Sequence, residues 1–113
     1  MSVEFTLAGY PFVGLNGGPH FKFTPATSFQ IHCEDQAEVD HYWDKLTDGG
    51  DPSMQRCGWC SDKFGISWQV IPRRFGELTK DGDITKVGRM VNAMQTMRKL
   101  DVAELEKAFN GDN

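Results

Sequence analysis

One strand-to-helix unit near the middle of the chain restricts the fold more than any other feature of the sequence. Residues 27–33 alternate between apolar and polar side chains, as expected for a β-strand that buries one face. The apolar face would carry Phe29, Ile31 and Cys33, and the opposite face Ser28, Gln30 and His32. A helix start follows at once, because Asp35 can cap the first turn and Glu38 can complete a capping box. The unit predicts a sheet that is covered by a helix on one side only.

The helix that starts at Asp35 is expected to end at the Gly49-Gly50 pair. Its apolar residues recur at helical spacing and predict one buried stripe. That stripe would consist of Val39, Tyr42, Trp43 and Leu46.

Further alternating segments predict four more strands. Residues 3–7 and 11–16 flank a break at Gly9 and indicate a hairpin, and a loop rich in turn formers follows as far as Pro25. Residues 55–61 and 66–71 indicate two strands joined by a turn over 62–65.

The last third of the chain has helical periodicity. A first helix would bury a stripe made of Ile84, Val87, Val91, Met94 and Met97. A second helix begins at Asp101, where Glu104 completes a capping box and Leu100 and Leu105 can form a hydrophobic staple. The methionines favour core or subunit packing over a promiscuous binding surface.

Length and charge limit the class of protein. A chain of 113 residues allows one domain. Its net charge of −4 argues against nucleic acid as a partner, and the apolar runs are too short to cross a membrane. No basic segment of a secretory signal opens the chain, and three cysteines do not suit a disulfide framework. We therefore expect a cytoplasmic protein.

Cys57 and Cys60 have the spacing of a redox pair or of half a zinc site. In an extended strand, side chains three apart point to opposite faces, which disfavours both uses. Zinc would need further ligands from a set without paired spacing: His20, His32, Cys33 and His41. A cysteine–histidine couple formed in space stays open. No phosphate-binding glycine motif occurs.

The polar faces of the predicted strands are the remaining candidate site. They carry Glu4, Thr6, Ser28, Gln30, His32, Ser67 and Gln69. Solvent exposure and a ligand pocket are both compatible with this pattern, and the curvature of the sheet would decide between them.

Several motifs together resemble one family across nearly the whole chain. They are Asn16-Gly-Gly-Pro19, Ser28-Phe29, Cys33-Glu-Asp35, Glu38-Val-Asp40, Tyr42-Trp43, Cys57-Gly58-Trp59, Asp62-Lys-Phe-Gly65, Ser67-Trp68-Gln69 and Pro72, followed by Met90, Ala93-Met94, Met97, Lys99, Asp101, Ala103, Leu105 and Ala108. The pattern resembles the PhnB-like branch of the vicinal oxygen chelate superfamily, which also holds glyoxalase I, extradiol dioxygenases and bleomycin-resistance proteins. Members are often labelled 3-demethylubiquinone-9 3-methyltransferase-like.

The resemblance implies an α+β fold in which βαβββ modules form a curved mixed sheet around a cavity. Residues 1–18 would be the hairpin remnant of a truncated first module, residues 27–72 a second module, and residues 83–110 a helical extension. The superfamily's metal-binding His and Glu positions fall at or near Ser28 and on Gln69. Both are neutral and weak ligands, so the resemblance implies no metal and no cofactor here.

These inferences predict a small-molecule binding protein. The expected pocket residues are Asn16, Ser28, Gln30, His32, Trp59 and Gln69. A truncated first module would leave sheet edges and a cavity wall uncovered, so we expect a homodimer. The alternatives are a metal-dependent lyase or dioxygenase, a methyltransferase as the family label says, and a redox protein that uses Cys57 and Cys60. Methyl transfer finds no support in the residues, because the glycine-rich first turn of a doubly wound domain does not occur.

Overall fold

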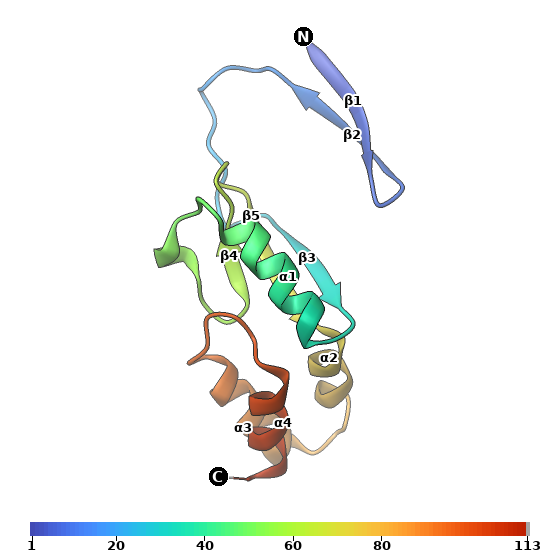
Figure 1. Cartoon of the computed structure of the whole chain (residues 1–113), viewed down its shortest axis with the longest axis vertical. Coiled ribbons are helices and arrows are strands. Elements are labelled where there is room, and N and C mark those ends of the chain that lie inside the picture. Colours follow the sequence, from blue (N-terminus) through green and yellow to red (C-terminus); the bar gives the residue numbers. More distant parts are fainter. Residues whose placement is uncertain (113) are drawn as a thin grey trace.

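A computed structural model describes residues 1–112 of the chain, and it has the predicted α+β class. Figure 1 shows a hairpin at one end, a small sheet with one long helix in the middle, and three helices at the other end. The elements are β1 (Ser2–Leu7), β2 (Tyr10–Leu15), β3 (Ser28–Cys33), α1 (Gln36–Thr47), the 3₁₀ turn η1 (Pro52–Met54), β4 (Trp59–Ser61), β5 (Ser67–Pro72), α2 (Arg73–Thr79), α3 (Ile84–Met94) and α4 (Val102–Asn110).

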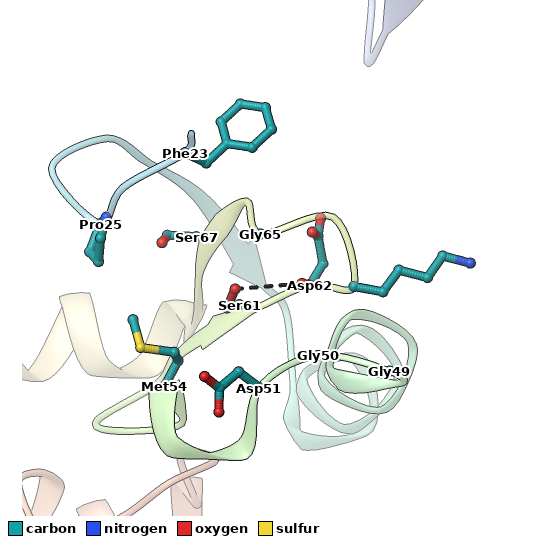
Figure 2. Close-up of a pocket in the computed structure, with 11 residues that line it drawn as sticks. Phe23, Pro25, Gly49, Gly50, Asp51, Met54, Ser61, Asp62, Gly65 and Ser67 are labelled. Atoms are coloured by element: carbon teal, nitrogen blue, oxygen red, sulfur yellow. Dashed lines mark hydrogen bonds between the residues drawn. The ribbon is translucent and has the colours of Figure 1, made fainter. Parts of the chain in front are cut away.

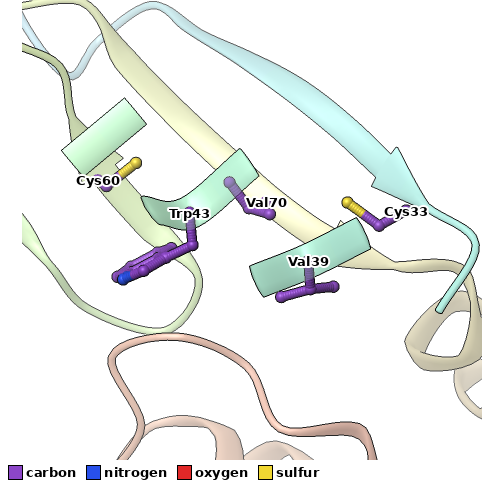
Figure 3. Close-up of a cluster of buried hydrophobic side chains, with 5 residues drawn as sticks. All are labelled: Cys33, Val39, Trp43, Cys60 and Val70. Carbon is purple, nitrogen blue, oxygen red and sulfur yellow. The ribbon is translucent and has the colours of Figure 1, made fainter. Parts of the chain in front are cut away.

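The central unit is a three-stranded sheet in the order β3-β5-β4. Strands β3 and β5 are parallel, and the chain between them passes through α1 and β4. Strands β4 and β5 are antiparallel. Helix α1 covers one face of the sheet, as the sequence predicts, and a core forms between them (Figure 3). Its buried side chains are Cys33, Val39, Trp43, Cys60 and Val70.

Helix α1 starts where the sequence predicts. The Asp35 carboxylate accepts a hydrogen bond from the Glu38 amide at 2.9 Å, which caps the helix. The predicted stripe is too wide, however, because Tyr42 is 36% exposed and packs edge-on against His41 instead. A sheet of three strands is narrow, so the helix buries only the line through Val39 and Trp43 fully.

The prediction of a strand over 55–61 is wrong in its first half. Cys57 and Gly58 have φ values of 52° and 84°, and they form a tight turn. Arg56 and Trp59 exchange two backbone hydrogen bonds of 3.0 and 2.7 Å across that turn. Extended pairing with β5 therefore begins only at Trp59.

The C-terminal helices form a second core, which consists of Leu78, Met90, Leu100, Leu105 and Phe109. Helix α2 was not predicted, because it has no side-chain cap and begins directly after Pro72. The predicted α3 stripe is also shifted. Ile84 is 88% exposed, while Met90 is fully buried, because the face of α3 that packs against α4 centres on Met90. The cap at Asp101 and the burial of Leu100 and Leu105 agree with the prediction.

The two cores are joined by polar contacts from α1 and from the 57–58 turn. The Gln36 amide donates to the Leu100 carbonyl at 3.0 Å and accepts from the Val102 amide at 2.7 Å. The Cys57 and Gly58 amides donate to the carbonyls of Met97 and Arg98, each at 2.8 Å. These bonds anchor the segment that precedes α4 to the sheet.

Strands β1 and β2 form the predicted hairpin, with Phe5 opposite Phe12. The hairpin is a separate two-stranded sheet, so the prediction that Glu4 and Thr6 share a sheet face with Ser28 and Gln69 is wrong. Figure 1 shows it apart from the three-stranded sheet, and the chain is correspondingly long, at 54 × 30 × 24 Å. Its apolar face carries side chains that are 42–70% exposed: Val3, Phe5, Leu7 and Tyr10.

Candidate functional site

The face of the three-stranded sheet opposite α1 carries two rows of mostly polar side chains that run across the strands. Paired residues of neighbouring strands project to the same side of a sheet. One row is Gln30, Gln69 and Trp59, and the other is Ser28, Ser67 and Ser61. This open face is the candidate site.

A hydrogen-bond network fixes the middle of the open face. The Gln69 amide donates to the Ser28 hydroxyl at 2.8 Å, and the Gln30 amide donates to the Gln69 carbonyl oxygen at 3.3 Å. Gln69 is half-buried and held from both sides, so its orientation on the sheet is defined. Trp59 lies next to it on β4 and is also half-buried.

The structure therefore brings together four of the six predicted pocket residues: Ser28, Gln30, Trp59 and Gln69. His32 follows on the same face of β3 and lines a groove of about 490 Å³ beside Arg73 and Phe75 of α2. Asn16 follows the hairpin, is exposed, and is not brought to the sheet. Asn16 was predicted from the family resemblance alone, whereas strand alternation supported the polar residues of β3 and β5.

Sequence reasoning did not place Ser61 and Ser67 in the pocket, although Ser67 was recognised on the polar face. They are the buried polar residues of the part of the chain described, at 8% and 3% exposure. Both line a hollow of about 490 Å³ at the end of the sheet (Figure 2). The turn predicted over 62–65 would have placed Ser61 opposite residue 66. The Asp62 amide in fact donates to the Ile66 carbonyl, so the loop is one residue longer and Ser61 pairs with Ser67.

Two of the three free cysteines face away from the site. Cys33 and Cys60 project toward α1, and burial raises the pKa of each thiol to about 11. Nearby carboxylates add to the shift, Glu38 and Asp35 at Cys33 and Asp62 at Cys60. Because a thiol must ionise to act as a nucleophile or metal ligand, both are suited to packing at neutral pH. Cys57 lies in the tight turn rather than in the extended strand that was predicted.

The superfamily's metal positions do not fit a divalent ion in this chain. The Ser28 hydroxyl and the Gln69 amide are neutral and bonded to each other. Within residues 1–112, no group of three or more His, Cys, Asp or Glu side chains is placed to hold a metal ion.

The helices of the described residues are all too short or too polar to span a bilayer. The cytoplasmic location stays a prediction.

The connectivity of β3, α1, β4 and β5, with an open polar sheet face opposite the helix, defines a glyoxalase-like α+β protein. The model of the 3-demethylubiquinone-9 3-methyltransferase family matches residues 1–71, which include the hairpin and most of this unit. The chain belongs to that family, and the PhnB-like label is correct.

One solved structure agrees with this assignment. A PhnB protein from Bacillus cereus, provisionally described as a 3-demethylubiquinone-9 3-methyltransferase, is 33% identical over 64% of this chain, with a TM-score of 0.54. The chain spans 64% of that protein's length. Protein PA1353 from Pseudomonas aeruginosa is 17% identical over 64% of this chain and 62% of its own, with a TM-score of 0.46. No curated protein sequence matches significantly.

Proposed function

We propose that this protein binds a small, partly polar organic molecule on the open face of its three-stranded sheet, without a bound metal. The observation that carries the proposal is the network of Ser28, Gln69 and Gln30 on that face. Ligand sites combine apolar and aromatic side chains with a few polar groups held in place, and this face offers both.

The network leaves hydrogen-bonding capacity unused. An amide group has two N–H donors and an oxygen with two lone pairs. Gln69 uses one donor toward Ser28 and one lone pair toward Gln30, so a donor and an acceptor remain for a ligand. The indole of Trp59 on the neighbouring strand supplies an apolar, planar contact surface. A neutral molecule with a flat region and a carbonyl or amide group matches this set.

A thermal-shift screen of metabolites tests the function. We expect at least one neutral organic compound to raise the melting temperature, because a ligand that binds only the folded state stabilises it. Gln69→Leu should abolish the shift, while Gln95→Leu, an exposed change at the end of α3, should preserve it.

The same thermal-shift screen distinguishes the competing functions. Stabilisation by a divalent ion that is lost in His32→Ala would favour a metal enzyme. Stabilisation by S-adenosylmethionine that is lost in Gln69→Leu would favour methyl transfer, the activity that the family description names. The first result would contradict the metal-free binding function. The second would keep the ligand on the open face but would replace binding alone with methyl transfer.

We also propose that the protein is a homodimer in which the second copy covers the hairpin. The chain exposes 8011 Å², whereas a compact monomer of its mass exposes about 6,200 Å². Its radius of gyration is 16.4 Å, against about 13 Å for a compact chain of this length. The excess area is of the size that a homodimer interface buries. An isolated two-stranded hairpin is at best marginally stable, so its apolar face needs a partner.

Phe5→Glu is expected to weaken the dimer about 100-fold or more, because it places a charge in the centre of the hairpin's apolar face. Light scattering over a range of protein concentrations measures the effect. The matched control is Thr6→Glu, which puts the same charge on the opposite face of the same strand. A wild-type chain that is monomeric at micromolar concentration would contradict the proposal.

A further inference from the structure

A hollow at the end of the sheet has the properties of a second ligand site, and one copy of the chain supplies its whole lining. Its lining comes from four segments: the loop before β3, the residues after α1, the end of β4 with its turn, and the start of β5. Figure 2 shows Ser61, Ser67 and Asp51 around this hollow, with Phe23 and Met54 at its sides. The hollow adjoins the Gln69 network but shares no residue with it.

Two buried hydroxyls of the hollow lack an adequate partner. Only 3% of the Ser67 surface is exposed to solvent. Its hydroxyl makes no hydrogen bond to a side chain or backbone group of residues 1–112. Ser61 is 8% exposed and reaches only the Asp62 carbonyl, at 3.5 Å, which is long for an O–H···O bond. Every fully enclosed polar side-chain atom of residues 1–112 has a hydrogen-bond partner. Because the Ser67 oxygen has no such partner, it is not fully enclosed and opens to the hollow that Ser67 lines.

The charges of the lining favour a cation. One oxygen of Asp51 accepts from the Ser53 amide at 2.9 Å and from its hydroxyl at 2.8 Å, and the other oxygen stays open. The same bonds hold the pKa of the Asp51 carboxyl below its usual range, so it is ionised at neutral pH. Asp62 adds a second carboxyl group, whose oxygens are engaged by the amides of Phe64 and Ile66 and the Trp68 indole. Lys63 at the rim holds its ammonium 5.2 Å over the Phe64 ring.

We infer that the hollow binds a primary ammonium group that carries a short apolar chain. An ammonium has three N–H donors and no acceptor, which matches the acceptor oxygens of Ser61, Ser67 and Asp51. Met54 and Phe23 are 36% and 66% exposed and offer apolar contact to the chain. An anion would meet the carboxylate of Asp51 with no compensating cation directed at it. The inference goes beyond the proposed function and does not depend on the dimer or on Gln69.

An NMR titration of the isotope-labelled full chain with n-butylammonium tests the site. We expect saturable shifts at the amides of residues 49–51 and 61–67, with a Kd on the order of 1 mM for so small a probe. Butyrate, with the same chain and the opposite charge, should produce no saturable shift there. Ser67→Ala and Asp51→Asn should each weaken binding about fivefold or more.

The control is Asp48→Asn, which removes a nearby exposed carboxylate that does not line the hollow and should leave the affinity unchanged. Ser67→Ala is expected to keep the folded spectrum, because the hydroxyl it removes has no internal partner. Equal responses to butylammonium and butyrate would overturn the inference. So would unchanged affinity in both Ser67→Ala and Asp51→Asn, or the absence of saturable shifts in the wild type.

Discussion

Replacing Gly50 with alanine is expected to lower the free energy of unfolding by about 3 kcal/mol or more. An added Cβ would lie 2.0 Å from the Ser61 carbonyl oxygen and 3.1 Å from the carbonyl carbon. These are backbone atoms of β4, so they cannot move aside as a flexible side chain would. The sheet and the segment after α1 would have to separate, which would also disturb the hollow formed by Asp51 and Ser61.

Urea unfolding followed by circular dichroism measures this effect, and Gly88→Ala is the matched control. Gly88 lies within α3, its φ is not positive, and an added Cβ would meet nothing within 4 Å. Alanine there should stabilise the protein by about 0.5–1 kcal/mol, since glycine is a poor helix former. If Gly50→Ala proved as stable as wild type, the close packing of residues 50 and 61 would be refuted.

Local signals in the sequence predicted the helix starts well. The Asp35 and Asp101 carboxylates cap the amides three residues further on, as expected. The return bonds of the predicted capping boxes do not form within residues 1–112, and the Glu38 carboxylate accepts from the Glu34 amide instead. The hairpin turn depends on Ala8 and Gly9, which both have positive φ. Such features are set by neighbouring residues, so they can be read without knowing the tertiary structure.

Features that depend on distant contacts were not predictable. The turn at Cys57 and Gly58 is held by the carbonyls of residues 97 and 98, which are remote in sequence. Its shape is also fixed by packing, because a Cβ on Gly58 would lie 3.1 Å from Leu100. The exposure of Ile84 likewise depends on where α4 packs, which periodicity alone does not reveal.

The open face of the sheet was partly predictable, because the alternation of side chains along a strand is a local property. Alternation placed Ser28, Gln30 and Gln69 on the face away from the helix, and register then brought them together. Ser61 was missed because the strand predicted over 55–61 runs through the turn at Cys57 and Gly58, and only its last three residues form a strand. A strand so short has too little alternation to identify its faces.

Replacing Leu105 with alanine is the second change with a large expected effect. Leu105 is 1% exposed and lies in the C-terminal core with Met90 and Leu100. Removing a buried leucine side chain typically costs about 2–5 kcal/mol, part of it from the cavity left behind. Leu15→Ala, at a side chain that is 75% exposed, should change stability by less than about 0.5 kcal/mol.

The same variant measures how strongly the two cores are coupled. Trp43 and Trp68 belong to the sheet core, and Trp59 lies on the open face of the sheet, so tryptophan fluorescence reports on that unit. Circular dichroism reports mainly on the helices. The bonds from Gln36 to residues 100 and 102, and the 2.8 Å ion pair between Lys99 and Asp40, predict that both signals shift together in urea. A shift confined to circular dichroism would mean that α2, α3 and α4 unfold separately from the unit of the sheet and α1, and that these contacts are too weak to couple the two units.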